Sequence, residues 1–143
     1  MKRMIVNKYG GPENLILDHI DSLLINELSV RIKVENIGVN FADTLIIRGR
    51  YQERPRPPFS PGLELSGTII EIGSKVLNHK TGDRVIGIAK FGAYCNEIVM
   101  PAENVYKIPD SMDFISAASF PVAYGTAFGA IDWKGNLQKG QTC

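Results

Sequence analysis

Short runs of β-branched or alternating residues, separated by glycine and proline, most constrain the fold of this 143-residue chain. In residues 29–35, apolar and charged side chains alternate with the period of a strand that buries one face. Residues 68–72 form a second β-branched run, which ends at Gly73. Further strands are expected at residues 4–6, 14–17, 84–87, 93–100 and 104–108. Many short strands at close, irregular spacing predict a mainly β barrel or sandwich.

Helical signals are fewer and fall in two places. Residues 40–47 begin with Asn40, a residue type that caps helix N-termini, and end near Gly49. In the last part of the chain, a short helix is expected over 111–119 and another over 123–131. Pro121 suits a first helical turn there. The sequence therefore predicts a mainly β domain with some α-helix.

Composition argues against several classes of partner. Sixteen Lys and Arg balance fifteen Asp and Glu, which gives no support for binding to nucleic acid. The longest apolar runs fall far short of the ~20 residues that span a bilayer. The basic N-terminus has no apolar stretch behind it of the kind found in secretory signals. We therefore expect a cytoplasmic protein that binds neither nucleic acid nor a membrane.

Motifs for several chemistries are missing from the sequence. None of the fourteen glycines lies two residues from another, so the Gly-x-Gly-x-x-Gly fingerprint of a dinucleotide-binding domain does not occur. No serine stands in a Gly-x-Ser-x-Gly elbow. The two histidines, His19 and His79, have no Cys or His partner at metal-ligand spacing, and His79 is expected in an exposed turn. No metal site is expected.

One proline-rich segment carries an unusual number of arginines. Arg48, Arg50, Arg54 and Arg56 alternate there with turn-forming residues, which predicts an extended surface loop. These side chains have two interpretations that the sequence leaves open. They form an anion-attracting rim beside a site, or they are solvated charges on a loop.

Several stretches match one family pattern in order and in spacing over nearly the whole chain. They are residues 38–46, 49–51, 61–67, 82–85, 91–94, 101–103, 117–121 and 124–127. Together they resemble the N-terminal half of a zinc-independent medium-chain dehydrogenase/reductase, in the quinone oxidoreductase branch related to zeta-crystallin. Where zinc alcohol dehydrogenases carry a Cys and a His, this chain has Asn40 and Leu63. The resemblance thus implies hydride transfer without a metal.

The resemblance also implies a division of the chain and a cofactor. Residues 1–120 would form a GroES-like, partly open β-barrel with flanking helices, which holds the substrate. Residues 121–143 would form a helical segment that leads towards a Rossmann domain absent from this chain. The family activity is hydride transfer from NADPH to a quinone or a related enone. By itself this chain would then be inactive, because the half that binds the cofactor is missing.

The resemblance carries over a set of candidate site residues. It implies Asn40 and Tyr51 as catalytic residues, and Asn40, Phe41, Thr44, Tyr51 and Thr126 as contacts to NADPH. Asn40 has a donor and an acceptor and could bind the nicotinamide or an acceptor carbonyl, or it could simply cap a helix. Tyr51 has a flat face and a phenolic donor, or it anchors a loop by packing. Thr126 faces the cleft, or it is an ordinary helix hydroxyl.

The sequence also contains two carboxylates that are candidates for acid–base chemistry, those of Asp43 and Glu64. Asp43 and Glu64 are not expected to act as acid or base, since solvent can supply the proton, and Glu64 is expected to serve structure.

One alternative function is reduction of enones or enoyl thioesters. Another is an interaction module whose uncovered helices over 117–131 bind a separate Rossmann-type half or a second copy. The third is a truncated relic without catalysis.

Overall fold

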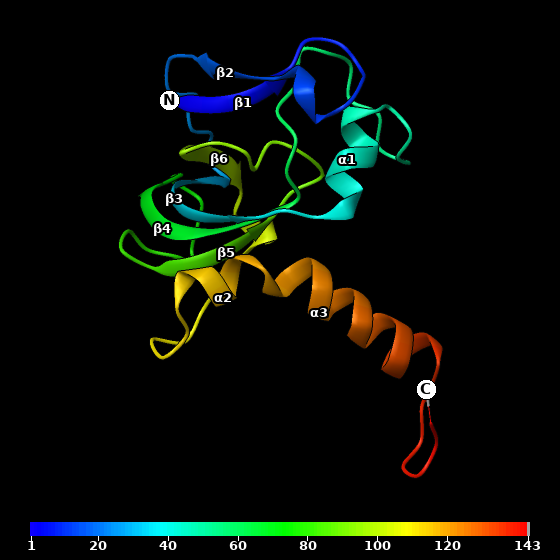
Figure 1. The fold of residues 1–143 in the computed structure, drawn as a ribbon. Helices are drawn as coiled ribbons and strands as arrows, with labels where there is room; N and C mark the ends of the chain where they lie inside the picture. The colour runs from blue at the N-terminus through cyan, green and yellow to red at the C-terminus, as the bar shows by residue number, and fades with distance from the viewer. Residues whose placement is uncertain (143) are drawn as a thin grey trace.

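Two antiparallel sheets form the body of the protein, which the computed structural model describes over residues 1–142 (Figure 1). The larger sheet has five strands in the order β6-β3-β4-β5-β7, and the smaller pairs β1 with β2. The strands are β1 Lys2–Val6, β2 Leu15–His19, β3 Ser29–Gly38, β4 Glu64–Ile72, β5 Arg84–Ile88, β6 Glu97–Pro101 and β7 Val105–Lys107. The helices are α1 Phe41–Ile47, α2 Phe114–Ala118 and α3 Phe120–Phe128, followed by a π-helical turn, Gly129–Lys134. The protein is therefore mainly β and partly open, as predicted.

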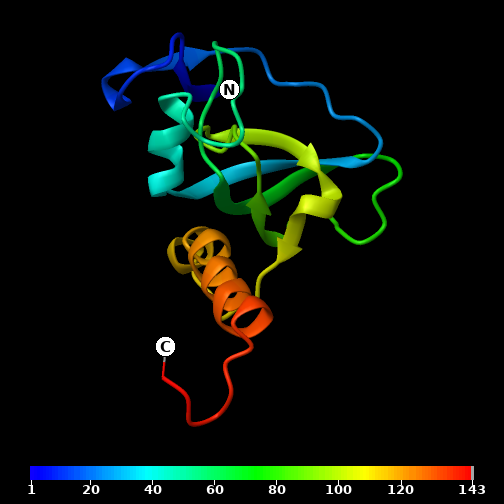
Figure 2. The same cartoon turned by 90° about the vertical axis from the view of Figure 1, so that its right-hand side faces the viewer.

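The elements lie in layers around the larger sheet. The β1–β2 pair lies on one side of it, and α2 and α3 lie on the other (Figures 1 and 2). Isolated bridges tie β1 to the loops, with Arg3 opposite Cys95 and Val6 opposite Phe59. Because each layer covers one face of the sheet, the sheet is buried between them near its middle.

The burial of β3 and β4 shows how the layers shape each strand. Along β3, Val30 and Ile32 are fully buried while Lys33 is exposed, which is the alternation expected for one buried face. At the start of β4, four consecutive residues, Glu64–Gly67, are buried. The second face is covered by α2, where the Ser66 hydroxyl donates to the Phe114 carbonyl oxygen at 2.6 Å. This strand therefore loses its alternation where a helix packs on it.

Two apolar clusters make up the core. The first lies within the larger sheet and contains Val30, Ile32, Leu65, Ile69, Val76, Val85, Ala93, Ile98, Met100, Ala102 and Val105. The second joins β1 to α1 and contains Val6, Ile46, Ile47, Phe59 and Leu63. Tyr51 and Val122 pack against the second cluster, so it also holds the start of α3.

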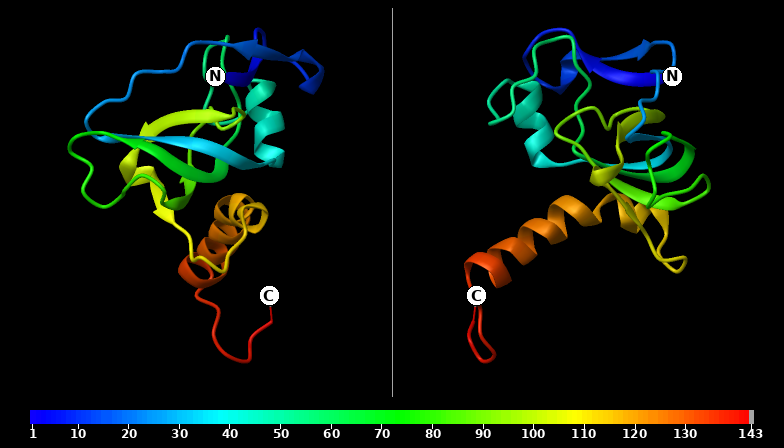
Figure 3. Two further views of the ribbon diagram at one scale, coloured as in Figure 1. Left: turned by 90° about the vertical axis from the view of Figure 1, so that its left-hand side faces the viewer. Right: turned by 180° about the vertical axis from the view of Figure 1, so that it is seen from behind.

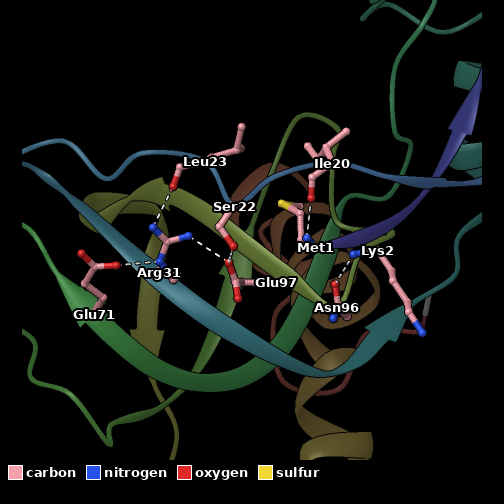
Figure 4. A network of polar contacts seen from close by, with 9 residues as sticks. All are labelled: Met1, Lys2, Ile20, Ser22, Leu23, Arg31, Glu71, Asn96 and Glu97. Carbon is pink, nitrogen blue, oxygen red and sulfur yellow. Dashed lines mark hydrogen bonds and ion pairs between the residues drawn. The ribbon is translucent and has the colours of Figure 1, made fainter.

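A polar network around Arg31 fixes the long connection before β3 (Figure 4). The guanidinium donates to Glu71 at 2.6 Å, to Glu97 at 2.9 Å and to the Leu23 carbonyl oxygen at 2.7 Å. The Ser22 hydroxyl donates to the same Glu97 carboxylate. The hydrogen bond to Glu71 is the main cause of the raised pKa of Arg31. Three strands and the connection thus meet at one cation.

Helix α3 leaves the body of the protein. It runs outward from the end of α2, and the chain continues through the π-helical turn to the C-terminus (Figures 1 and 3). No residue of α3 is buried. Only its first turn touches the core, through Val122.

The predicted elements agree with the observed ones, with small differences in their bounds. All seven predicted strands and all three predicted helices are present. The strand predicted over 93–100 begins only at Glu97, because residues 93–96 form a bend in which the Cys95 N–H donates to the Ala93 carbonyl oxygen. Asn40 is the N-cap of α1, and Pro121 lies in the first turn of α3.

The prediction for His79 was wrong. The residue is buried, at 8 % exposed, because its turn folds back against Ala102. Its Nε2 lies 3.3 Å from the Ala102 carbonyl oxygen, and its Nδ1 lies 3.9 Å from Asp83. The neighbouring Leu77 takes the exposed place instead, at 94 %.

Within residues 1–142, no helix is both long enough and apolar enough to cross a bilayer.

Candidate functional site

The buried carboxylate of Glu64 lies at the junction of β4, α1 and α3. It is 2 % exposed. One oxygen, Oε1, accepts a hydrogen bond from the Asn40 side-chain amide at 2.8 Å. The other, Oε2, accepts from the Val122 backbone N–H at 2.8 Å. Val122 lies in the first turn of α3, where backbone N–H groups lack helical partners and favour a negative charge. Glu64 therefore joins the starts of two helices.

The bond to Glu64 sets the orientation of the Asn40 amide. A carboxylate oxygen only accepts, so the Asn40 nitrogen must face Glu64. The Asn40 oxygen Oδ1 is then directed away from Glu64. Asn40 thus offers a ligand chiefly an acceptor. Asn40 is also the N-cap of α1, where it forms a capping box with Asp43, which confirms its capping interpretation. A contact of Asn40 to the nicotinamide or to an acceptor carbonyl stays a prediction.

Gly38 allows these helices to approach the end of β3. A Cβ placed there would lie 2.2 Å from Glu64 Oε1 and 2.6 Å from the Ala118 carbonyl oxygen. The second atom belongs to backbone and cannot move aside cheaply. A glycine at this position therefore makes room for the buried carboxylate and for the junction between α2 and α3.

Asp43 supports the same turn from inside. It is 1 % exposed, and its Oδ2 accepts from the Asn40 backbone N–H at 2.8 Å and from the Tyr94 hydroxyl at 3.1 Å. Its other oxygen, Oδ1, has no partner among the described residues. Burial raises the pKa of Asp43 above its ordinary value of 3.8, and hydrogen bonds from Asn40 and Tyr94 offset this only in part.

Tyr94 completes this buried pair. Burial, and then the nearby Asp43 carboxylate, raises the pKa of the Tyr94 hydroxyl well above its ordinary range. The ring is held against Gly62, where a Cβ would lie 2.5 Å from Tyr94 Cδ1. Gly62 also has a φ of 102°, which side chains rarely tolerate. The hydroxyl is thus a fixed donor to Asp43.

The residues predicted for the site lie on three segments. Asn40, Phe41 and Thr44 occupy the first turn of α1 and its cap, Tyr51 follows that helix, and Thr126 lies on α3. Phe41 is 77 % exposed, Thr126 is exposed, and Tyr51 is half-buried against the second core cluster. The Thr44 hydroxyl donates to the Phe41 carbonyl oxygen at 2.8 Å, which leaves it an acceptor.

The contacts of Glu64 bring two of these segments together, the start of α1 and α3. Asn40 and Val122 share its carboxylate, and Thr126 lies one helical turn beyond Val122. The site is an open wall rather than an enclosed pocket, because several of its side chains are exposed. Such a wall suits the flat ring of a cofactor, with Asn40 Oδ1 as a hydrogen-bond acceptor and Phe41 as an apolar face. Within residues 1–142, no cluster of three His, Cys, Asp or Glu side chains could hold a metal ion.

The fold belongs to a recognised class of domain. The sequence model of the alcohol dehydrogenase GroES-like domain matches residues 26–110. The chain therefore belongs to the alcohol dehydrogenase GroES-like domain family. This confirms the GroES-like fold and the medium-chain dehydrogenase/reductase resemblance seen in the sequence.

Within this family, the chain is similar to quinone oxidoreductases, to quinone oxidoreductase-like proteins and to a VAT-1 homolog-like protein. The quinone oxidoreductase-like protein 2 homolog of Nematostella vectensis is 40 % identical over 142 residues, which are 99 % of this chain and 39 % of that protein. The crystal structure of human synaptic vesicle membrane protein VAT-1 homolog-like protein has a TM-score of 0.93 at 32 % identity, over 98 % of this chain and 45 % of that one. Escherichia coli quinone oxidoreductase, crystallised with NADPH, has a TM-score of 0.87 at 30 % identity, over 92 % of this chain and 40 % of that one. The chain spans less than half the length of each.

Sequence reasoning did not identify Tyr94 as part of the buried support. A family stretch, residues 91–94, contained it, but nothing in the local pattern linked it to Asp43, fifty-one positions away. The structural role expected for Glu64 agrees with its two buried hydrogen bonds. The available signal for Glu64 was an acidic residue between two leucines, Leu63 and Leu65.

Glu64→Gln tests the junction. Glutamine keeps one acceptor but places an NH2 group against either Asn40 or Val122, so one buried donor loses its partner. We expect the free energy of unfolding to fall by about 1–3 kcal/mol. We also expect the Val122 amide to exchange faster with solvent. Urea unfolding and amide hydrogen exchange measure these effects. Glu103→Gln, at an exposed position, is the matched control; equal behaviour of the two variants would contradict the role of Glu64.

Asp43→Asn tests the raised pKa of Asp43. Because the folded state favours the protonated acid, Asp43 stabilises the fold most below its unfolded pKa, and this advantage is lost as pH rises through the raised folded pKa. The unfolding free energy of wild type minus that of Asp43→Asn should therefore fall with rising pH. Urea unfolding from about pH 3 to about pH 7 measures this difference.

Asp83→Asn is the control with the opposite sign. Burial raises the pKa of Asp83, but Lys107 and the Lys80 N–H lower it by more, so its net shift is downward. Its contribution to stability is present above the unfolded pKa of 3.8 and is lost as pH falls through the lowered pKa. The difference for Asp83→Asn should rise with pH. Parallel slopes for the two variants would contradict the assignment.

Proposed function

We propose that this chain forms the acceptor side of an NADPH-dependent quinone oxidoreductase-like protein. Residues 1–120 hold the substrate, and residues 121–143 lead towards a cofactor-binding domain. The observation that carries the proposal is the Asn40 amide, held by Glu64 at 2.8 Å at the point where α1 and α3 begin. The quinone oxidoreductase-like relatives, and the NADPH in the Escherichia coli quinone oxidoreductase crystals, support it.

Each candidate residue then has a defined task. Asn40 Oδ1 would accept a hydrogen bond from the carboxamide of the nicotinamide and so help to hold the ring. Phe41 and Tyr51 supply apolar faces for the ring, and Thr126 extends the wall from α3. The cofactor, when bound, supplies the hydride. No side chain needs to supply the proton, since solvent reaches this open wall.

The acceptor is a quinone or an enone. Enoyl thioesters are the alternative substrate class, because they also take a hydride at a polarised carbon–carbon double bond. A panel of simple quinones and 2-enoyl thioesters, offered to a two-domain form, separates these classes. Higher kcat/KM for the quinones supports the proposal, and the reverse order supports the alternative.

We expect no NADPH oxidation above background from the 143-residue chain alone, because one wall of the site binds only one side of the cofactor. Joined to the remainder of its Nematostella vectensis relative, the chain should oxidise NADPH with 1,4-benzoquinone. In that form Asn40→Ala should lower kcat/KM about two- to tenfold, the effect of one lost hydrogen bond.

Asn78→Ala, at an exposed position in a distant loop, is the control and should leave kcat/KM unchanged. Enzyme-like turnover by the chain alone would contradict the assignment of half a site. An Asn40→Ala variant with wild-type kcat/KM would contradict the role of Asn40.

An interaction module is the second candidate function, favoured by an apolar stripe on α3. Phe120, Tyr124 and Phe128 are spaced four residues apart, so they share one helix face. They are 43 %, 63 % and 64 % exposed, and the Phe120 and Tyr124 rings stack at 4.9 Å. In relatives more than twice as long as this chain, the stripe would pack against a further domain. Uncovered, such a stripe favours self-association.

Phe128→Glu tests the stripe. We expect the 143-residue chain to form dimers or larger species at tens of micromolar, and Phe128→Glu to shift it to monomer. Light scattering on a size-exclusion column measures the mass. Leu24→Glu, which adds the same charge at a position 95 % exposed, should leave the mass unchanged. A wild-type chain that is monomeric throughout would contradict this surface.

A further inference from the structure

A cavity at the far end of α1 lies outside the candidate site. Its volume is about 320 Å³, and its lining residues are Tyr9, Gly10, Arg48 and Arg50. The candidate site uses the first turn of α1 and, from the segment after this helix, Tyr51, which does not line the cavity. The function proposed above assigns it no task.

Of the four arginines in this segment, only Arg48 and Arg50 line the cavity. Arg48, Arg50, Arg54 and Arg56 are all exposed, and within residues 1–142 none of them forms an ion pair. Two make hydrogen bonds to backbone: Arg48 to the Thr44 carbonyl oxygen at 3.1 Å, and Arg54 to that of Tyr51 at 3.2 Å. The side chain of Arg50 makes none in the same part of the chain.

The carboxylates in the neighbouring segments are already engaged. Glu13 accepts from the Gly11 backbone N–H at 3.0 Å, and Glu53 pairs with Lys90 at 3.3 Å. Their charges are therefore directed at other donors. The positive charge of Arg48 and Arg50 is left for a ligand or for solvent.

The floor of the cavity is held in place by several contacts of Tyr9. Its ring lies against Gly49, whose φ is 65° and where a Cβ would lie 3.0 Å from Tyr9 Cδ1. Its hydroxyl donates to the Pro55 carbonyl oxygen at 3.0 Å, and its ring packs on Phe59 with centroids 6.3 Å apart. The wall is therefore positioned by the fold, not by a ligand.

The end of α1 does not present free carbonyl groups to repel an anion. A helix C-terminus normally leaves its last carbonyl oxygens without partners and carries a partial negative charge. Here each of the last four accepts a backbone N–H: Thr44 from Arg48, Leu45 from Arg50, Ile46 from Gly49 and Ile47 from Gly10, at 2.8–3.3 Å. The guanidinium donors are left as the polar groups of the cavity.

We propose that this cavity binds the phosphate group of a small phosphorylated ligand. Two guanidiniums on either side of a glycine provide planar pairs of N–H donors, which match the oxygen geometry of phosphate. A dianion balances both positive charges. The volume lies at the low end of small-molecule sites, so it fits a phosphate group with a small attached moiety. The inference stands independently of the proposed reductase function, since it uses none of its residues.

The test is a titration of the isotope-labelled 143-residue chain with inorganic phosphate at constant ionic strength, followed by amide NMR signals. We expect saturable shifts at Tyr9, Gly10 and residues 48–50. The double variant Arg48→Gln/Arg50→Gln should bind at least tenfold more weakly. Its matched control, Arg54→Gln/Arg56→Gln, removes the same charge from the same segment and should bind within twofold of wild type.

Two results would overturn the proposal. One is the absence of saturable shifts in the wild-type chain. The other is equal weakening in both double variants, which would show attraction to diffuse charge rather than to a site. If the first double variant unfolds, Arg50→Gln alone decides, because the side chain of Arg50 supports no other contact within residues 1–142. A fivefold or larger loss of affinity supports the site, and an unchanged affinity excludes it.

Discussion

The buried carboxylate of Glu64 is the interaction on which the rest of this structure depends. A charged group inside a β-rich core is costly unless every oxygen finds a donor. Here one oxygen receives the Asn40 amide and the other receives the first turn of α3. The cost of burial is thereby offset by donors that themselves lacked partners. Removal of the carboxylate would leave the Asn40 side-chain amide and the Val122 N–H without this acceptor.

The same arrangement couples the fold to the candidate site. Glu64 turns the Asn40 amide so that its oxygen is directed away from the carboxylate, and Asp43 holds the Asn40 backbone from the other side. The position of a single side chain is thus determined by two buried acids on different elements. Neither acid needs to exchange protons with a substrate. Their contribution is to hold a hydrogen-bonding group in one orientation, which is what binding a flat ring requires.

The two ends of α1 differ in chemistry because their backbone groups are satisfied differently. At its start, the Asp43 carboxylate accepts the Asn40 backbone N–H and the Glu64 carboxylate accepts the Asn40 side-chain amide, so the amide oxygen is directed away from Glu64. At its end, backbone N–H groups take the carbonyl oxygens and leave guanidiniums instead. A seven-residue helix therefore separates an acceptor-bearing wall from a cationic cavity. The exposed apolar stripe lies on α3, which has no buried residue and runs outward from the body of the protein.

Local patterns in the sequence determined the strands, the helices and the family. The alternation over residues 29–35 and the cap at Asn40 depend on neighbours within a few positions, so they could be read directly. The order and spacing of eight short stretches showed the resemblance to quinone oxidoreductases. Three contacts join residues that lie 23 to 58 positions apart in the sequence. They are His79 with Ala102, Asp43 with Tyr94, and Glu64 with Val122. A local sequence pattern does not show which residues so far apart in the chain come into contact. Only the tertiary structure decided these contacts, because burial and hydrogen-bond partners depend on which distant segments pack together.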